Sequence, residues 1–265
     1  MITYNLLNKY NEIAHFCTDR EGGVSMGNYA SFNLSPFSGD NPANVNKNKE
    51  ILCKQFGIDA EKLIIPYQTH GTKILEIDDS FFQLSQYEKT QSLNGIDALF
   101  THLKNVCIAV TTADCVPLLF FDPQKQVIAV AHAGWRGTCS KIAEKTVQRL
   151  IDKFDCNPAD ILAVVGPSIS SKVYEVGKEV VDSFENAGFE ISRIVTIRNH
   201  SFYLDLWKAN QLSLQSVGVL LDHIEISGIC THTEHERFFS ARRLGVKSGR
   251  ITSGIMLTGE QGIIV

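Results

Sequence analysis

The sequence predicts an α/β protein of the α+β type, a layered sandwich of mixed β-sheets flanked by helices. Strand-sized apolar runs dominate the first half of the chain, and strands and helices alternate in the second half. Their order is too irregular for a Rossmann fold or a TIM barrel. Neither an internal repeat nor a linker rich in Pro, Gly or Ser divides the chain, so we expect residues 1–265 to form a single domain.

In the first half, apolar runs of strand length alternate with loops. Residues 13–37 predict a strand followed by a Gly-rich loop and a polar loop. Asn41 and Pro42 then start a helix that continues to about Phe56, because proline is favoured at the first helical position. Residues 78–95 are polar and predict a surface excursion. The other strands predicted in this half cover residues 63–67, 73–77, 97–101 and 106–112.

In the second half, a hairpin is followed by alternating helices and strands. Thr138 is expected to cap a helix whose apolar residues recur at helical spacing as far as Ile151. Two further helices are predicted over residues 177–187 and 205–217. The strands predicted beyond the hairpin cover residues 161–165, 223–229 and 251–257.

The composition excludes several classes of partner. The 265 residues are 44% hydrophobic and 20% charged, with a net charge of −4 and no basic tract, so we expect neither nucleic acid nor an anionic membrane as a partner. No apolar run is long enough to span a bilayer, and the N-terminus lacks the pattern of a signal peptide. The seven cysteines are odd in number and scattered, which favours a reducing compartment, the cytoplasm. A monomer or a small homo-oligomer is expected.

The most informative stretch is the predicted hairpin of two apolar strands. Its turn, residues 122–125 (DPQK), has typical turn composition. If the turn is a four-residue loop, Phe121 faces Gln126, and Cys115 faces His132 at the open end. Opposed residues have Cβ atoms roughly 4.5–5.5 Å apart, close enough for a thiolate and an imidazole to share a metal ion or a proton. A slip of one residue would place the two on opposite faces.

His70 has the same setting as His132, because each follows a predicted strand and precedes a corner that contains glycine. If the strand ends meet, His70, Cys115 and His132 offer three ligands and leave one tetrahedral position open, as in catalytic zinc sites. The alternative is a buried strand-end thiol near two unrelated histidines. No His-x-His pair occurs, and the supply of imidazoles is too small for the four coppers of a multicopper oxidase.

Three charged residues could serve such a site. Asp114, next to Cys115, is a candidate proton carrier, or it fixes the corner by accepting hydrogen bonds from backbone N–H groups. Arg242 and Arg136 lie near aromatic residues in the sequence, and an arginine fork with aromatic rings suits a phosphate and a flat base. The alternative for Arg242 is an edge strand with exposed arginines.

The chain resembles the bacterial laccase-domain family, also labelled multicopper polyphenol oxidase-like. The resemblance runs nearly from end to end, and it is carried by QTHG around His70, TADCVP around Cys115 and HAGWRG from His132. It extends to residues 18–25, 31–34, 97–99, 166–169, 174–177, 204–206, 209–210, 230–231 and 239–243. The family fold is a layered sandwich with mixed sheets, similar to the catalytic domain of cytotoxic necrotizing factor toxins.

The resemblance implies a site and a chemistry. The metal ligands fall on His70, Cys115 and His132, with zinc as the metal and copper possible, and the catalytic residues would be Cys115, His132 and Asp114. The implied reactions are phosphorolysis of adenosine, inosine, guanosine and methylthioadenosine, and deamination of adenosine, so the partners are purine nucleosides and phosphate. The residues expected to bind substrate are Asn33, Gln68, Arg136, Phe239 and Arg242.

Other functions stay open at this stage. Cys115 and His132 could form a cysteine or metal amidase that acts on a muramyl peptidoglycan precursor. A copper-dependent polyphenol oxidase and a non-catalytic metal or nucleotide binder are further alternatives. The chain also departs from the family pattern, with Lys141 at a usual glycine and Ser170-Ser171-Lys172 before Tyr174, and these departures bear on substrate preference.

Overall fold

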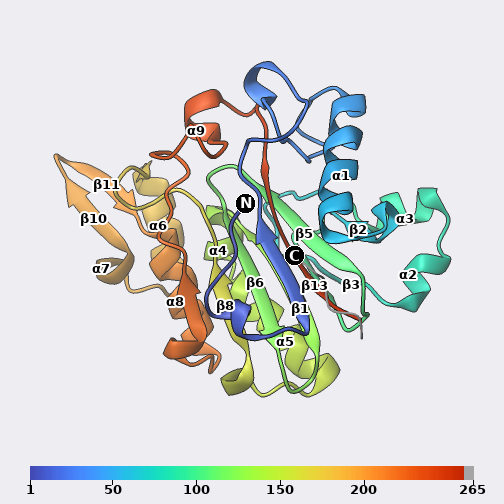
Figure 1. The fold of residues 1–265 in the computed structure, drawn as a ribbon. Helices are drawn as coiled ribbons and strands as arrows, with labels where there is room; N and C mark the ends of the chain where they lie inside the picture. Colours follow the sequence, from blue (N-terminus) through green and yellow to red (C-terminus); the bar gives the residue numbers. More distant parts are fainter. Residues whose placement is uncertain (260–265) are drawn as a thin grey trace.

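The computed structural model describes residues 1–259 and has the mixed α/β architecture that the sequence predicts (Figure 1). A four-stranded sheet has the order β1-β13-β5-β2, formed by Ile13–Cys17, Ile251–Leu257, Cys107–Thr112 and Leu63–Ile64. A six-stranded sheet has the order β12-β8-β6-β7-β4-β3, formed by Ile224–Ile226, Leu162–Val165, Val116–Asp122, Val127–Ala133, Ala98–Thr101 and Ile74–Glu76. Both sheets contain parallel and antiparallel pairs.

The central strands are apolar on both faces, so other layers pack on each face of the six-stranded sheet. In β6, Leu119 and Phe121 pack between the two large sheets, whereas Leu118 and Phe120 face the helices on the other side. Successive side chains of a strand point to opposite faces, so a continuous apolar run is buried on both. A third cluster joins α1 (Pro42–Phe56) to the outer face of the four-stranded sheet. The result is a helix–sheet–sheet–helix sandwich (Figure 1).

The helices begin and end at recognisable signals. Asn41 accepts a hydrogen bond from the N–H of Ala43 at the start of α1, and Gly57, with a φ of 61°, ends it. The layer beyond the six-stranded sheet contains α5 (Ile142–Phe154), α6 (Lys178–Asn186) and α8 (Leu206–Ser216). The shorter α-helices are α2 (Asp79–Gln83), α3 (Gln86–Ser92), α4 (Trp135–Cys139), α7 (Ile191–Ile194) and α9 (Ala241–Leu244). The 3-10 helices are Leu7–Lys9, Gly27–Tyr29, Ala60–Lys62, Pro158–Asp160 and Leu221–His223.

The hairpin register differs from the predicted one by two residues. Asp122 pairs with Val127, so the loop covers residues 123–126, and Pro117 lies opposite His132. The reason is that Asp122 belongs to the strand, while its carboxylate accepts hydrogen bonds from the N–H groups of Gln124 and Lys125 and closes the turn. The predicted opposition of Cys115 and His132 is therefore wrong. A shift of two residues still keeps both side chains on one face.

Several element predictions also need correction. Thr138 lies inside α4, where its hydroxyl donates to the carbonyl of Ala133, so it does not cap a helix. The helical conformation is interrupted at Lys141, which has a φ of 65°, and α5 begins after it. A positive φ favours glycine, which accounts for the glycine that the resembled family usually has at the position of Lys141. The strand predicted over 63–67 is shortened to β2, and the excursion over 78–95 contains α2 and α3.

A small third sheet was not predicted at all. Its order is β10-β11-β9, formed by Val195–Arg198, Ser201–Leu204 and Glu175–Val176. The segment around Arg242, for which an edge strand was the alternative, forms the short helix α9 instead. No helix among residues 1–259 is long and apolar enough to cross a bilayer.

Candidate metal centre

Three side chains predicted as metal ligands converge at one end of the sheets. The ligand atoms of His70, Cys115 and His132 all lie within 4.8 Å of one another. Cys115 immediately precedes β6, His132 lies near the end of β7, and His70 comes from the loop after β2. The two imidazole rings meet edge to face, with centroids 4.7 Å apart. His132 is buried, Cys115 is half-buried and His70 is exposed, so the site opens to solvent on the side of His70.

Gly134 makes room for this cluster. If the hairpin register is continued by one residue, Gly134 lies opposite Cys115. A Cβ atom on Gly134 would lie 2.9 Å from Cδ2 of His70 and 3.0 Å from Sγ of Cys115. Since these distances are shorter than normal contacts, a side chain here would push the ligands apart.

Asp97 orients both histidines, although sequence analysis gave it no role. Its Oδ1 accepts hydrogen bonds from the backbone N–H of His70 at 2.9 Å and from Nδ1 of His132 at 2.8 Å. Its Oδ2 accepts from the N–H groups of Gly71 at 2.7 Å and Thr69 at 3.2 Å. Burial opposes ionisation of Asp97, but the bonds from His132 and the backbone outweigh it and lower its pKa. Its position, an aspartate just before an apolar strand, was the available signal.

The thiol and the imidazole stabilise each other's charged forms. Burial alone would raise the pKa of Cys115, but the charge and hydrogen bond of His132, together with His70, lower it. Burial alone would lower the pKa of His132, but the thiolate and Asp97 raise it. Cys115 is therefore poised as a thiolate, which is the form that binds a metal or attacks a carbon atom.

The donor set fits a transition metal. A thiolate and two imidazoles are the ligands that zinc and copper accept, and three protein ligands leave one position for water or substrate. Because Nδ1 of His132 is bonded to Asp97, its Nε2 remains for a metal. Carboxylate–histidine pairs of this kind fix the tautomer and orientation of metal-binding histidines.

The carboxylate of Asp114 forms hydrogen bonds with two separate segments of the chain. Asp114 has a φ of 79°, and its carboxylate accepts hydrogen bonds from the hydroxyls of Thr231 at 2.8 Å and Ser240 at 2.9 Å and from the N–H of Arg242 at 2.7 Å. These contacts bring the segments of residues 231 and 240–242 to the corner that bears Cys115. A role as proton carrier remains a prediction.

The side chains of Gln68 and Asn33, which were predicted to bind substrate, form hydrogen bonds with other residues of the protein. The side chain of Gln68 donates to the carbonyl of Thr111 at 2.9 Å and accepts from its N–H at 2.8 Å. Asn33 is buried; its amide donates to Ser38 and Asp40 and accepts from the N–H of Arg250 at 3.0 Å. Both side chains therefore position neighbouring backbone, and their binding of substrate remains a prediction.

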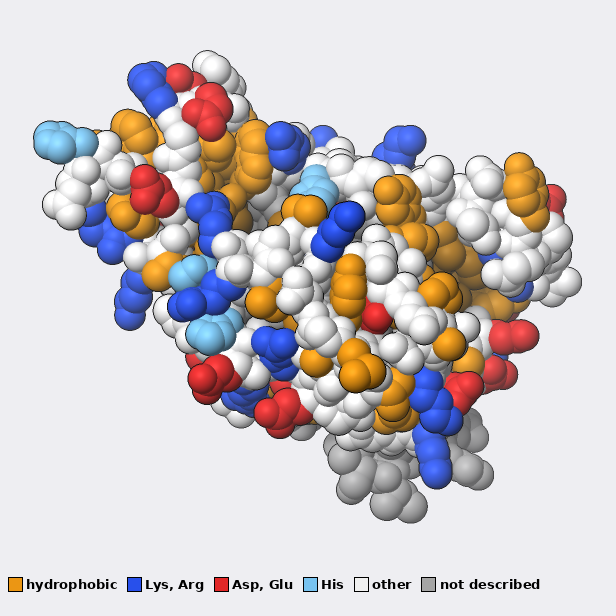
Figure 2. All heavy atoms as spheres, turned by 90° about the horizontal axis from the view of Figure 1, so that it is seen from above, with side chains coloured by type: hydrophobic (Ala, Val, Ile, Leu, Met, Phe, Trp, Pro, Cys, Tyr) orange, Lys and Arg blue, Asp and Glu red, His pale blue; other side chains and the backbone are white. Residues whose placement is uncertain are grey.

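The predicted aromatic and cationic residues lie in different surroundings. Phe239 is fully buried, with the guanidinium of Arg20 4.9 Å from its ring centroid, so it offers no face to a base in this conformation. Arg136 is exposed and covers the ring of Trp135 at 4.3 Å. Arg242 donates to the carbonyl of Glu175 at 3.3 Å and lies 5.3 Å from the ring centroid of Tyr174. Figure 2 shows cationic, acidic and apolar side chains interspersed on the face seen from above.

Tyr174 is the aromatic residue that sequence analysis missed as a candidate for substrate contact. It is half-buried, and burial raises its pKa to about 12, with the charge of Cys115 acting in the same direction and that of Arg242 opposing it. Its ring centroid lies 5.3 Å from the guanidinium of Arg242. The motif that contains it was recognised, but its role depends on the third sheet, which was not.

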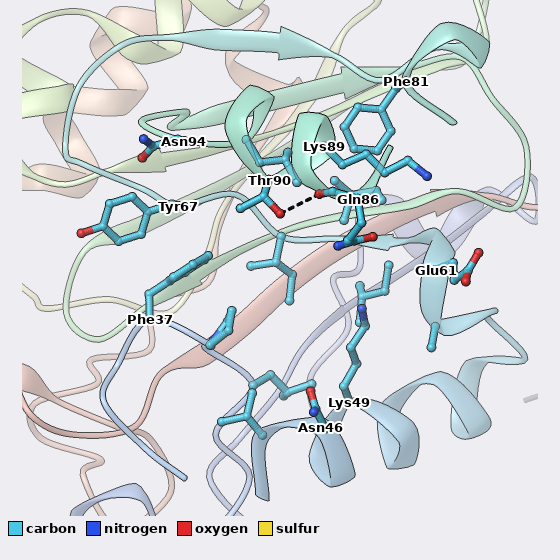
Figure 3. A pocket seen from close by; sticks show the side chains of 18 of the residues that line it. Phe37, Asn46, Lys49, Glu61, Tyr67, Phe81, Gln86, Lys89, Thr90 and Asn94 are labelled. Atoms are coloured by element: carbon cyan, nitrogen blue, oxygen red, sulfur yellow. Dashed lines mark hydrogen bonds between the residues drawn. The ribbon is translucent and has the colours of Figure 1, made fainter. Parts of the chain in front are cut away.

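A groove separate from the His70, Cys115 and His132 cluster is shown in Figure 3. It has a volume of about 870 Å³ and runs between α1, β2 and α3. Apolar and polar residues line it, with the lysines Lys49 and Lys89 and the glutamates Glu50 and Glu61 among them, and none of the three predicted ligands does. Tyr67, three residues before His70, is part of its wall. The groove therefore contains neither the thiol nor the imidazoles of the cluster.

The chain is similar to several known proteins along nearly its whole length. Residues 14–258 match the family described as multi-copper polyphenol oxidoreductase laccase. A purine nucleoside phosphorylase of Bacteroides thetaiotaomicron is 43% identical over 259 residues, 97% of this chain and 96% of that protein. The adenosine deaminase RL5, from an unknown prokaryotic organism, is 40% identical over 243 residues, 91% of this chain and 92% of that protein. The crystal structure of Bacillus licheniformis YfiH has a TM-score of 0.88 at 31% identity and covers 95% of each chain. The chain therefore belongs to the multi-copper polyphenol oxidoreductase laccase family.

Proposed function

We propose that this protein is a zinc-dependent purine nucleoside phosphorylase that also deaminates adenosine. The observation that supports this most directly is the Cys115/His132/His70 cluster, oriented by one buried carboxylate. The names of the relatives point to the same two reactions. The proposed substrates are adenosine, inosine, guanosine and methylthioadenosine, with phosphate as the second substrate.

In this proposal His70, Cys115 and His132 hold the metal, and Asp97 keeps both histidines in place. Zinc, when bound, supplies a Lewis acid that can activate water near neutral pH, and copper would suit the same ligands. The imidazoles of His132 and His70 lower the pKa of Cys115 and so favour the thiolate form that binds a metal. Asp114 is best assigned to positioning, since its carboxylate already accepts three hydrogen bonds.

We assign substrate contacts to the rim around Cys115. Arg242, with Arg136 as a second candidate, provides positive charge for phosphate. Tyr174 replaces Phe239 as the proposed stacking partner of the purine, because its ring is partly exposed and lies beside Arg242. Its hydroxyl makes no hydrogen bond to another residue within 1–259, so it is free to meet a substrate.

Replacing Cys115 with alanine tests the proposal. We expect Cys115→Ala to lose bound zinc and at least about 100-fold in phosphorolysis of inosine, because one of three metal ligands is gone. The assay follows free base, ribose 1-phosphate and zinc content together. Cys139→Ala is the matched control, since Cys139 is also half-buried but bonds to the carbonyl of Ser183. Full phosphorolysis by zinc-free Cys115→Ala would reject the proposal.

A cysteine amidase is the second candidate, and one observation favours it. Cys115, His132 and Asp97 form a thiolate–imidazole–carboxylate series, the arrangement used by nucleophilic cysteine hydrolases. Its substrate would be an amide such as a muramyl peptide precursor. Trapping of an acyl group on Cys115 in the metal-free protein would favour this function over the first.

Three broader features belong to the same proposal. We treat the chain as a single domain, because one apolar core joins strands from its beginning, middle and end. We place it in the cytoplasm, because all seven cysteines are free. We expect a monomer or a small homo-oligomer without nucleic acid or membrane partners.

A further inference from the structure

The backbone of an additional arginine, Arg250, lies beside the corner that carries Cys115. Arg250 immediately precedes β13, where Ile251 pairs with Thr112 of β5. If this register is continued by one residue, Arg250 lies opposite Ala113, directly before Asp114. Its backbone N–H donates to the buried amide of Asn33 at 3.0 Å, which fixes the backbone at this point.

The guanidinium of Arg250 is held without a carboxylate partner. It donates to the carbonyls of Ser248 at 2.6 Å, Gly249 at 3.0 Å and Val246 at 2.9 Å. Among residues 1–259, no carboxylate oxygen lies within 4.0 Å of the guanidinium nitrogens of Arg250, so Arg250 forms no ion pair with the described residues. Burial lowers the pKa of Arg250, while the charges of Cys115 and Asp114 raise it. Taking a cation partly out of water is unfavourable unless an anion accompanies it.

Asp114, the carboxylate whose charge acts on Arg250, is already occupied. It accepts hydrogen bonds from the hydroxyls of Thr231 and Ser240 and from the N–H of Arg242. A guanidinium has five N–H donors, and Nε of Arg250 makes no hydrogen bond to the described residues. Arg250 therefore has its charge and two N–H donors, one on Nε and one on Nη2, left for an anion at the site.

We infer that Arg250 binds the phosphate substrate, together with Arg242, whose backbone N–H donates to Asp114. This inference rests on the proposed phosphorolysis. In that reaction a phosphate oxygen forms a bond to C1′ of the ribose, and the bond from C1′ to N9 breaks with its electron pair going to the purine. The purine takes up one proton, supplied by dihydrogen phosphate or water. Arginine suits the phosphate because its planar fork donates two parallel hydrogen bonds.

Arg250→Met separates this role from a merely structural one. Losing one hydrogen bond between charged partners costs about 1.5–3 kcal/mol, so we expect the KM for phosphate to rise about 10- to 100-fold. The KM for inosine should change far less. With adenosine as substrate, the ratio of phosphorolysis to deamination should fall at low phosphate, because only phosphorolysis uses phosphate. Arg250→Lys, which keeps the charge without the fork, should give an intermediate KM for phosphate.

Arg20→Met is the matched control. Arg20 is also half-buried, its side chain donates to the carbonyls of Ala30 and His235, and burial lowers its pKa. Any loss caused by loosened loops should affect both reactions of Arg20→Met in parallel. If Arg250→Met does not fold, as judged by thermal unfolding, Arg250→Gln takes its place, because it keeps donors for the loop carbonyls and removes the charge.

The outcomes distinguish two failures. Wild-type protein that forms no ribose 1-phosphate contradicts the proposed function itself. Phosphorolysis by the wild type with an unchanged KM for phosphate in folded Arg250→Met or Arg250→Gln overturns only the role of Arg250. A parallel loss of phosphorolysis and deamination, as in Arg20→Met, would also overturn it and leave Arg250 as a loop anchor.

Discussion

At the scale of single residues, the site depends on one buried carboxylate. Asp97 bonds to the backbone of His70 and to the ring of His132, so it couples two ligands from distant segments. The predicted trio of His70, Cys115 and His132 came mainly from the family resemblance. The residue pattern alone left open a buried thiol beside two unrelated histidines, and the register that opposed Cys115 to His132 was wrong. Asp97, Tyr174 and Arg250 could not be recognised in the sequence, since their roles arise only when separate strands and loops meet in space.

Asp97→Asn should weaken metal binding. The amide keeps only one accepting oxygen, so it cannot accept both from Nδ1 of His132 and from the N–H groups of Gly71 and Thr69, and one set of these donors loses its partner. We expect zinc affinity to fall about 10- to 100-fold, as for other carboxylates that orient metal-binding histidines. Competition with a chromophoric chelator measures it.

Asp122→Asn is the matched control for that prediction. Asp122 is also fully buried and accepts from two backbone N–H groups, but it lies in the turn at the other end of the hairpin. This variant should lose stability and keep wild-type zinc affinity. Equal zinc affinity in Asp97→Asn and the wild type would show that Asp97 does not orient the ligands.

At the scale of elements, the strands and long helices followed from apolar periodicity, whereas registers and small elements did not. The hairpin register shifted by two residues because Asp122 both pairs in the strand and closes the turn. The apolar periodicity alone does not specify at which residue of the segment 122–125 (DPQK) the strand pairing ends. The β9-β10-β11 sheet escaped prediction because its strands are short and largely exposed, so alternation of apolar and polar residues is weak.

Helix α1 anchors the loop that leads to Asn33 through one buried side chain. Asn48 accepts from the N–H of Val24 at 2.8 Å and donates to the carbonyls of Ser31 at 3.1 Å and Asn33 at 2.8 Å. Asn48→Ala would leave these groups without partners in a buried environment. We expect the free energy of unfolding to fall by about 2–4 kcal/mol, measured by denaturant titration.

Asn46→Ala is the control on the same helix, because Asn46 is exposed and makes no side-chain hydrogen bond within the described chain. It should change the free energy of unfolding by less than about 0.5 kcal/mol. If Asn48→Ala were as mild as Asn46→Ala, the loop would not depend on this helix.

At the scale of the whole molecule, the sandwich brings the site together. The two large sheets pack face to face, so the end of β7, the start of β6 and the loop after β2 reach the same end of the core. The layered fold was predictable because the apolar runs of β6 and β7 are continuous, which requires cover on both faces. The pairing of distant strands, such as β1 with β13, was not, because no local signal specifies it.

The central claim is that one metal on His70, Cys115 and His132 is needed for nucleoside phosphorolysis. The most direct measurement removes the metal with a chelator and then titrates zinc back, while ribose 1-phosphate formed from inosine and phosphate is quantified. We predict that phosphorolysis disappears with the metal and returns in proportion to bound zinc, up to one ion per chain. Undiminished phosphorolysis by the metal-free protein would contradict the claim.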